Sequence, residues 1–415
     1  MTQNGKHVIV VGGGASGMTA AFFALRQGAR VTLLEHNEKL GKKLYITGKG
    51  RCNVTNACDL DTFLANVPHN PRFLHAAFAF LPPQALMNLL SELGCLTVVE
   101  RGRRVFPASQ KASDVTKALT RALAAADIHL NTHVAEITVQ DGICTGVLLS
   151  NGEAVASDAV VLATGGVSYP VTGSTGDGYT YAQALGHKVS TPLPCLVPME
   201  TADAWPRQLQ GLTLTNVILQ AKRGKKMLFN QQGELLFTHF GVSGPLVLSL
   251  SSYIAGLVLS ELSVSIDLKP AVSHEQLMQR LNNVLAENGR KQLSSILPQL
   301  MPMSLAQVFP GIAGIEPQAL CSQLTRAQRQ RLIDTLKGIP LHLSAFRPLD
   351  EAVITRGGVA VSQVHPSSMQ SKLVNGLYFA GEVLDVDALT GGYNLQIAFS
   401  TGALAGHHAA QHSLM

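Results

Sequence analysis

Residues 7–35 read HVIVVGGGASGMTAAFFALRQGARVTLLE, and this stretch decides the fold expected for the chain. Residues 8–11 are all valine or isoleucine, which is typical of a strand buried on both faces. Three glycines follow in G-x-G-x-x-G spacing, ahead of a helix-like segment and a second strand: Gly12, Gly14 and Gly17. Such glycines permit a tight turn, close approach of backbone to a pyrophosphate, and close packing of helix on strand. The helix N-terminus adds unpaired N–H groups and partial positive charge, so the stretch predicts dinucleotide binding rather than a purely structural turn.

Glu35 ends the second strand, close to the roughly 20-residue offset at which an acid accepts from ribose hydroxyls. An acid at this position disfavours a 2′-phosphate and suits FAD or NAD. Residues 38–56, EKLGKKLYITGKGRCNVTN, then form a glycine-rich basic loop. Its position after the second strand suits contact with phosphates or a flavin edge, and the alternative is a solvated surface loop.

Composition limits the class of protein. The 415 residues suffice for two or three domains, and 14% charged with 46% hydrophobic residues allow large buried cores. The net charge of +5 is mild, and no Lys/Arg block of nucleic-acid type is present. The densest basic cluster, Arg101, Arg103 and Arg104, is interpreted as a local phosphate or carboxylate contact or as solvated. The six cysteines show no C-x-x-C or zinc spacing, so we expect reduced thiols and a cytoplasmic protein.

No signal peptide or membrane span is expected. A short polar start leads directly into the first strand. Residues 240–260 lack a formal charge, but Gly244, Pro245 and several serines favour a buried helix and strand over a span. His408 and His412 lie four residues apart without a third ligand, so no metal site is predicted.

Residues 71–94, interrupted by Pro82-Pro83, and residues 113–126, with Ser113 or Asp114 as N-cap, are expected to be helical. Residues 96–107 suggest a hairpin, and residues 128–156 suggest a small antiparallel meander. Residues 158–166, DAVVLATGG, read as another buried strand that runs into a turn-rich loop.

Prolines near residue 190 mark a junction, after which residues 190–272 read as strands and residues 273–345 as helices, with Ser273 and Gln276 forming a capping box. Residues 376–382, GLYFAGE, and the helix opened by TGGYNLQ then repeat the pattern of an apolar strand, an acid, a glycine turn and a helix. The predicted fold is α/β, with a Rossmann-like domain formed by residues 1–189 and 346–415, an inserted β-rich domain at 190–272 and an inserted helical subdomain at 273–345.

Six stretches in order resemble one bacterial family of FAD-binding flavoproteins: GGGASG, GKGRCNVTN, ATGGVSYPVTGSTGDGY, THFGVSGP, TRGGV and GLYFAGEVLDVDALTGGYNLQ. Its members include aminoacetone oxidase and a bile-acid enoyl reductase, and weaker similarity reaches fumarate reductase flavoproteins. The resemblance implies a glutathione-reductase-type FAD domain interrupted by a β-barrel-like domain and a helical lid. One departure is Glu382, where the wider superfamily usually has aspartate.

The resemblance also implies a set of FAD contacts. The adenosine and pyrophosphate would meet the first turn and its acid, the basic loop would lie near the cofactor, and the last glycine turn would line ribitol and flavin. The predicted residues are Gly12, Gly14, Ala15, Ser16, Gly17, Glu35, His36, Lys43, Gly48, Gly50, Arg51, Cys52, Asn53, Val134, Ala163, Thr164, Gly165, Gly381, Glu382, Gly391, Gly392, Asn394 and Leu395. The helix start at 391–395 would favour negative charge on the flavin N1/O2 side.

Catalytic candidates rest on residue type alone. Cys52 is a candidate redox or flavin-contacting thiol, and His239 and Tyr393 are candidate proton donors. For each of the three, the alternative is a side chain that only packs in the protein. The predicted function is an FAD-dependent oxidoreductase of a small organic substrate that passes electrons to an activated C=C bond or to O₂. NAD(P)H is a candidate donor that would bind transiently, because only one dinucleotide fingerprint is present. The alternatives are a flavin-dependent tRNA-modification partner, for which no basic tail is found, and a non-catalytic FAD sensor.

Overall fold

The structure is a computed structural model that describes residues 5–411. The chain divides into two compact units, unit 1 (Met1–Cys195 and Leu349–Met415) and unit 2 (Leu196–Pro348). The insertion was expected at 190–345, whereas unit 2 spans 196–348, and strand pairing explains the shift at both ends. Strand β11 (Val189–Cys195) pairs with β19 (Ile354–Val359) inside unit 1, and β18 (Leu343–Phe346) joins a sheet of unit 2.

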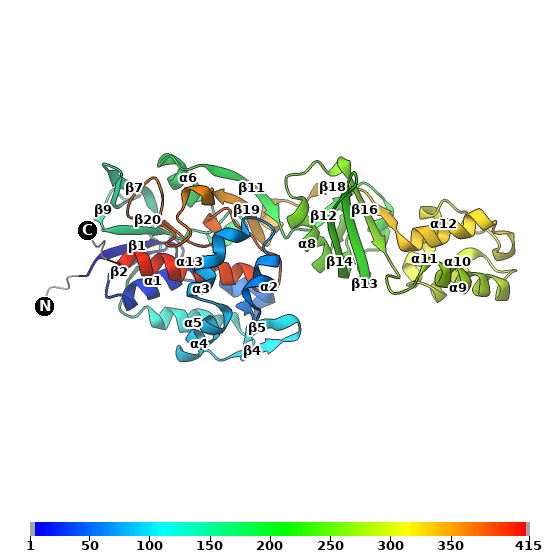
Figure 1. Cartoon of the computed structure of the whole chain (residues 1–415), viewed down its shortest axis with the longest axis horizontal. Coiled ribbons are helices and arrows are strands. Elements are labelled where there is room, and N and C mark those ends of the chain that lie inside the picture. The colour runs from blue at the N-terminus through cyan, green and yellow to red at the C-terminus, as the bar shows by residue number, and fades with distance from the viewer. Residues whose placement is uncertain (1–4, 412–415) are drawn as a thin grey trace. The chain divides into compact units, whose positions relative to one another are not determined.

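A five-stranded parallel sheet forms the centre of unit 1, in the order β20–β10–β1–β2–β6 (Figure 1). Every residue of β1, β10 and β20 is buried, which explains their uninterrupted apolar sequences. The five strands are β1 (His7–Val11), β2 (Arg30–Leu34), β6 (Asp127–His129), β10 (Ala159–Leu162) and β20 (Leu377–Phe379).

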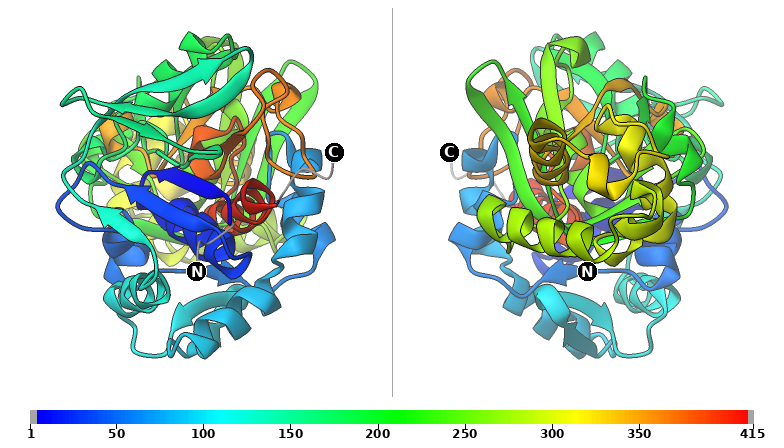
Figure 2. Two further views of the ribbon diagram at one scale, coloured as in Figure 1. Left: turned by 90° about the vertical axis from the view of Figure 1, so that its left-hand side faces the viewer. Right: turned by 90° about the vertical axis from the view of Figure 1, so that its right-hand side faces the viewer.

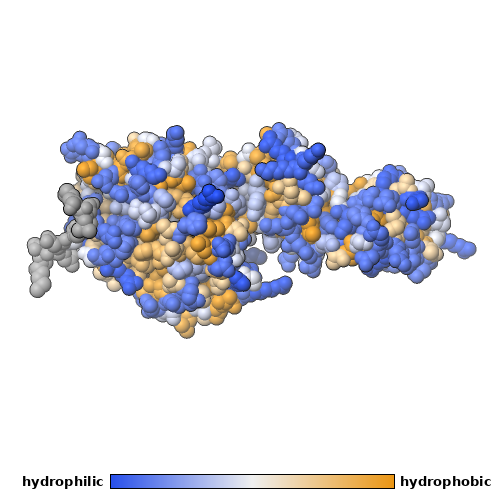
Figure 3. Space-filling model, viewed as in Figure 1, coloured by the Kyte–Doolittle hydropathy of each residue, from blue (hydrophilic) through white to orange (hydrophobic). Residues whose placement is uncertain are grey.

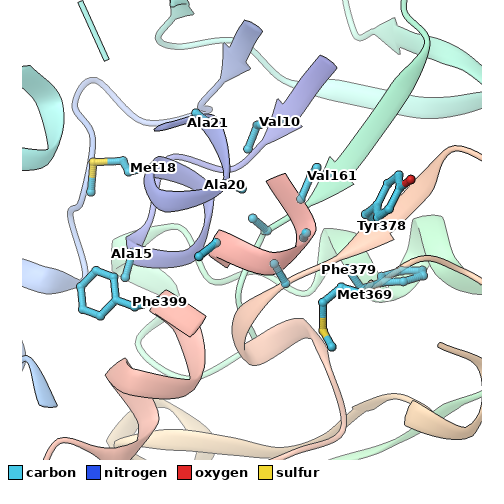
Figure 4. Close-up of a cluster of buried hydrophobic side chains, with 14 of the residues drawn as sticks. Val10, Ala15, Met18, Ala20, Ala21, Val161, Met369, Tyr378, Phe379 and Phe399 are labelled. Carbon is cyan, nitrogen blue, oxygen red and sulfur yellow. The ribbon is translucent and has the colours of Figure 1, made fainter. Parts of the chain in front are cut away.

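The first and last long helices of unit 1 pack on one another and on this sheet. They are α1 (Ala15–Arg26) and α13 (Tyr393–Ala410), drawn in blue and red in Figure 2. Small residues allow the close approach: a Cβ at Gly402 or Gly406 would overlap the backbone carbonyl of Ser16 or Ala20. Figure 4 shows Ala15, Ala20 and Phe399 in the buried cluster that these helices share with the sheet. Segments from opposite ends of the chain therefore form one core.

Two three-stranded antiparallel sheets and several helices complete unit 1. Residues 128–129, expected in the meander, instead extend the parallel sheet as β6. The expected N-cap of α5 is also wrong, because the helix begins at Ala112 with Lys111 as N-cap and no side-chain cap. The elements are β3 (Thr55–Asn56), β4 (Thr97–Glu100), β5 (Arg104–Pro107), β7 (Val134–Gln140), β8 (Ile143–Leu149), β9 (Ala154–Ala156), α2 (Leu60–Ala65), α3 (His75–Phe80), α4 (Pro83–Glu92), α5 (Ala112–Ala122) and α6 (Asp177–Ala184).

Unit 2 is built on a seven-stranded sheet in the order β17–β16–β13–β14–β15–β12–β18. Its first and last strands are separated along the chain by His342 alone, so the two edges lie within two Cα–Cα steps of each other and the sheet must curl, like a barrel. The remaining strands are β12 (Met199–Thr201), β13 (Thr213–Arg223), β14 (Lys226–Phe237), β15 (Gly241–Ser243), β16 (Leu262–Asp267) and β17 (Ile339–Leu341).

The helices of unit 2 are α7 (Trp205–Gln208), α8 (Pro245–Ile254), α9 (His274–Glu287), α10 (Leu293–Ile296), α11 (Met303–Ile312) and α12 (Arg326–Lys337). The capping box at Ser273 and Gln276 is confirmed, and Thr325 and Gln328 form a second one before α12. The expectation of a buried helix within 240–260 is confirmed by α8.

No single helix within residues 5–411 is both long and apolar enough to cross a bilayer. The bent pair Pro71–Phe80 and Pro83–Glu92 would be long and apolar enough together, by length and composition only.

Figure 3 shows apolar residues among polar ones on the face of unit 1 where α1, α3 and α13 lie. His412, considered above with His408, falls outside the described residues, and α13 ends at Ala410.

Candidate functional site

The first glycine turn leaves room for a ligand at one glycine only. A Cβ at Gly12 would stand 2.6 Å from the Ala163 carbonyl oxygen, and one at Gly17 would overlap the Gly12 carbonyl. A Cβ at Gly14 would meet nothing within 4 Å, so this glycine faces open space. Helix α1 begins there without a side-chain cap. The turn therefore offers backbone N–H groups and partial positive charge to an anion, as a pyrophosphate requires.

Glu35 is held against this turn by three hydrogen bonds. Its Oε2 accepts from the Gly13 N–H at 2.7 Å, and its Oε1 accepts from the backbone and side-chain N–H groups of Asn37 at 2.8 and 2.7 Å. The carboxylate is buried at the end of β2. The adjacent His36 ring stacks on His133 with centroids 5.3 Å apart. These contacts fix the orientation of the acid that we expect to accept from a ribose.

A second polar network joins four segments that lie far apart in sequence. The Lys43 ammonium donates to Glu382 Oε2 and to Ser168 Oγ, both at 2.7 Å. The other carboxylate oxygen of Glu382 accepts from Ser168 Oγ at 2.9 Å and from the Thr355 N–H at 2.8 Å. The longer acid at 382 thus connects the basic loop, the loop after β10 and strand β19.

The last glycine turn is fixed by protein contacts rather than left open. Gly391 and Gly392 both have positive φ, and a Cβ at Gly392 would overlap the Thr55 carbonyl. The Asn394 side chain donates to and accepts from the backbone of Ala388, at 2.7 and 2.9 Å. Helix α13 starts at Tyr393 with no side-chain cap, so its positive end is available to a group bound in front of it.

The loop after residue 44 is anchored through Arg51. Its guanidinium pairs with Glu100, donates to Gln110 Oε1 at 2.6 Å, and lies 4.0 Å from the Phe106 ring centroid. Gly48, Lys49, Gly50 and Cys52 all have positive φ, which gives this loop its tight winding. Arg51 is therefore held by the β4–β5 hairpin, and its expected contact with the cofactor stays a prediction.

Two buried polar atoms in these segments have no partner among the described residues: Asn53 Oδ1 and Thr164 Oγ1. Buried polar groups are rarely left unsatisfied, so such atoms suit a bound polar molecule. Together with the open space at Gly14 and the two uncapped helix starts, they fit FAD. All the predicted cofactor residues lie in unit 1, Val134 included, whose carbonyl accepts from the Tyr181 hydroxyl at 2.6 Å.

The three catalytic candidates do not form one group. Cys52 is fully buried, and burial raises the pKa of its thiol to about 12, so the thiol stays protonated at neutral pH. Tyr393 is buried beside Phe63, and burial raises the pKa of its hydroxyl. His239 is exposed in unit 2, next to Phe240 in the turn between β14 and β15.

Two buried acids before the last glycine turn, Asp385 and Asp387, were not among the functional residues predicted from the sequence. Asp385 accepts from Ser190 Oγ at 2.7 Å and pairs with His69 Nε2 at 3.0 Å. Asp387 is 1% exposed; its Oδ2 accepts from the Cys195 thiol at 3.5 Å, and its Oδ1 has no partner among the described residues. The signal was present in GEVLDVDALTGG, where two acids precede the turn inside an apolar run.

The two carboxyl groups have different electrostatics. Burial raises the pKa of Asp387 to about 6, against the opposing attraction of Arg356 and His69 and the hydrogen bond from Cys195. Burial acts the same way on Asp385, but hydrogen bonds from His69 and Ser190 outweigh it and lower the pKa of that group. When the pKa values of two neighbouring carboxyl groups are shifted in opposite directions, one group commonly serves as an acid and the other as a base.

A family model described as "HI0933-like protein Rossmann domain" matches residues 6–408. The chain belongs to the HI0933-like family. A curated relative, 3-dehydro-bile acid delta(4,6)-reductase of Clostridium scindens, is 32% identical over 97% of this chain and 98% of its own length. Ribosomal RNA dihydrouridine synthases of Haemophilus influenzae and Escherichia coli are each 31% identical, over 97% and 95% of this chain and the same shares of their own lengths.

Solved structures show the same fold at lower identity. A 3-ketosteroid delta1-dehydrogenase from Sterolibacterium denitrificans has a TM-score of 0.52 at 14% identity, covering 97% of this chain and 99% of its own. The FrdA subunit of E. coli quinol fumarate reductase has a TM-score of 0.51 at 16% identity, covering 98% and 70%. This HI0933-like protein is an FAD-dependent flavoprotein oxidoreductase with a Rossmann-type FAD-binding fold, as the sequence predicted.

Proposed function

We propose that this HI0933-like protein is an FAD-dependent reductase that saturates a C=C bond conjugated to a carbonyl group. The observation that carries the proposal is what its curated relatives have in common. The name of the first describes reduction of conjugated double bonds in a 3-oxo bile acid. Dihydrouridine, formed by the other two, is uridine whose ring C=C bond next to a carbonyl has been reduced. The same bond type is thus acted on in both cases.

The residues of unit 1 have distinct tasks in this proposal. FAD, when bound, supplies the two-electron redox chemistry. The turn at Gly14 and the acid Glu35 hold its ADP end, and the Lys43–Glu382–Ser168 network closes the adjoining loops around the ribitol side. The uncapped start of α13 favours negative charge in front of Asn394, which stabilises the reduced, anionic form.

We propose NAD(P)H as the electron donor. The chain has a single G-x-G-x-x-G turn, and FAD would occupy it, so the nicotinamide would bind transiently and without a Rossmann unit of its own. Transfer of electrons to O₂, as in an amine-type oxidase, is the competing outcome. The six cysteines are all free and buried, which supports our placing the activity in the cytoplasm.

We propose a small organic enone as the substrate class. The second candidate is a uracil ring in ribosomal RNA, and two observations favour it specifically. Two relatives that match along almost the whole chain are ribosomal RNA dihydrouridine synthases. Arg101 and Arg103, between β4 and β5, and Arg104, at the start of β5, are also all exposed, where a backbone phosphate can be contacted.

The test uses purified holoprotein under anaerobic conditions. We expect flavin absorbance that NADH or NADPH bleaches, and that 2-cyclohexen-1-one or 4-androstene-3,17-dione restores together with the saturated ketone. Recovery of absorbance only on admitting air indicates an oxidase and contradicts the proposal. The holoprotein is also incubated with ribosomal RNA from a strain that lacks its own ribosomal RNA dihydrouridine synthase. If dihydrouridine forms in this RNA and neither enone reacts, the second candidate is the function.

A further inference from the structure

The buried acids Asp385 and Asp387 lie in the segment that leads into the last glycine turn. Reducing a carbonyl-conjugated C=C bond adds a hydride to one carbon and a proton to the other. Asp387 precedes Ala388, whose backbone N–H and C=O are both hydrogen-bonded by the Asn394 side chain at the start of α13, where we expect the flavin. Its Oδ1 is buried and has no partner among residues 5–411. Of the three candidates named from residue type, His239 is an exposed turn residue of unit 2, and burial raises the pKa of the Cys52 thiol and of the Tyr393 hydroxyl, which makes both weaker acids than a carboxyl group.

We propose that the Asp387 carboxyl is the proton source of this reductase, and that Asp385 and His69 refill it from solvent. This rests on the proposed C=C reduction. His69 is partly exposed, pairs with Asp385 Oδ1 at 3.0 Å, and forms a backbone bridge with Asp387. His69 therefore connects the protein surface with the segment that carries both acids.

The step balances without a further reagent. The bound FAD would supply a hydride, with its electron pair, to the carbon distant from the carbonyl, and the π bond of the C=C group would break to provide the electron pair for the second C–H bond. The O–H bond of Asp387 breaks, its proton forms the new C–H bond next to the carbonyl, and the electron pair of the O–H bond stays on the carboxylate. A proton from solvent, passed by His69 and Asp385, restores the acid.

The surroundings of Asp387 suit a group that gains and loses a proton at ordinary pH. The charged or titratable groups that act on it are Arg356, His69, Asp385 and the Cys195 thiol, which come from β19, the segment after α2, its own segment and β11. The cations and the thiol favour the carboxylate, whereas burial and Asp385 favour the acid. The resulting pKa of about 6 is close to that of an efficient general acid near neutral pH.

The first experiment compares the wild-type holoprotein with Asp387→Asn and His69→Gln. Each is reduced with dithionite without oxygen and mixed with 2-cyclohexen-1-one, and flavin reoxidation is followed. We expect Asp387→Asn to slow reoxidation about 100-fold or more, while reduction by dithionite is unchanged. The wild-type rate should fall as pH rises through about 6, and the variant should lose that dependence. In His69→Gln the first turnover should keep its rate and later turnovers should slow.

Asp203→Asn is the matched control. Asp203 also pairs with a histidine, with its Oδ1 2.9 Å from His342 Nδ1, but it lies in unit 2. We expect it to behave as wild type. Flavin content and unfolding temperature are measured for every variant, so that misfolding of Asp387→Asn is recognised; His69→Gln then carries the test.

A second measurement needs no substrate. Infrared difference spectra of the holoprotein should show a buried carboxyl C=O band that disappears as pH rises through about 6, is absent in Asp387→Asn and persists in Asp203→Asn. An Asp387→Asn variant that reoxidises within about threefold of wild type with the same pH profile overturns the proposal, as does the absence of that band. Failure of the wild type to react with the enone, with the band present, instead counts against the proposed function and leaves the proton-holding role of Asp387 supported.

Discussion

The two glycine turns of unit 1 each start a helix without a side-chain cap, and each has a buried acid, but the acids are held differently. At the first turn, Glu35 receives hydrogen bonds from Gly13 and Asn37 on both oxygens. At the second, one carboxylate oxygen of Asp387 accepts from the Cys195 thiol, and the other has no hydrogen-bond partner within residues 5–411. The glycines differ too, since Gly14 faces open space whereas Gly392 lies against Thr55.

This difference separates two kinds of site within one cofactor domain. The first turn is satisfied by its own residues and leaves space for an anion, so it suits holding a molecule that stays bound. The second turn is packed tightly and keeps an acid whose protonated form is favoured by burial, so it suits proton transfer. Substitutions at the two turns should therefore affect different measurements.

The largest effect is expected from Gly17→Ala. The new Cβ would overlap the Gly12 carbonyl, and backbone atoms of a buried turn cannot move aside cheaply. We expect a loss of more than about 4 kcal/mol of unfolding free energy, or failure to fold, together with loss of bound flavin. Urea unfolding followed by circular dichroism measures it; a stable variant that retains its flavin would show that this turn is not packed as described.

The next effect concerns the pH dependence of stability set by Asp387. Its folded-state pKa of about 6 lies above the value of about 4 expected in the unfolded chain. The folded state thus binds more protons between these values, and the group's contribution to stability, complete below about pH 4, is lost as pH rises through about 6. Two pKa units correspond to about 3 kcal/mol.

Asp387→Asn removes this dependence. Compared with wild type, the variant should become more stable by up to about 3 kcal/mol on going from about pH 4 to pH 7. Unfolding in urea at the two pH values tests it, with Asp203→Asn, an acid paired on the surface of unit 2, as control. A stability difference that does not change with pH means that Asp387 is already ionised well below pH 6.

A smaller effect is expected from Gly14→Ala. The glycine has negative φ and its Cβ position is empty, so alanine should leave the unfolding free energy of the apoprotein within about 0.5 kcal/mol. A methyl group there would obstruct the approach of a pyrophosphate, weakening FAD binding about 10- to 100-fold. Titration of apoprotein with FAD measures it; unchanged affinity means that the cofactor does not approach this glycine.

The sequence predicted the first turn well because its structure depends on local contacts. The buried strand, the spacing of Gly12, Gly14 and Gly17, and Glu35 all lie within one stretch of chain, and the structure has each in the expected element. The family and the FAD-binding fold followed from the same stretch and the motifs in order with it. Local capping signals such as Ser273 with Gln276 were readable for the same reason.

What the sequence could not show depends on contacts between distant segments. Strand β11 belongs to unit 1 because it pairs with β19, more than 150 residues later. The electrostatic surroundings of Asp387 come from Arg356, His69 and Cys195, which are all distant from it in sequence or belong to other strands. Cys52 was singled out by its motif, but only burial shows that its thiol stays protonated.

The smallest effect is expected from Ser273→Ala, which tests whether a local change in unit 2 leaves FAD binding in unit 1 unaltered. Ser273 caps α9, where its hydroxyl accepts from the Gln276 N–H and its own N–H donates to the Gln276 side chain. Ser273→Ala removes one half of this capping box and should cost about 1 kcal/mol of unfolding free energy. Because the change is confined to a helix end of unit 2, FAD affinity and the pH profile set by Asp387 should be unchanged. Urea unfolding and FAD titration of this variant, beside the equivalent Thr325→Ala at α12, decide the point: a change in FAD affinity in either variant would show that the helices of unit 2 influence the cofactor site.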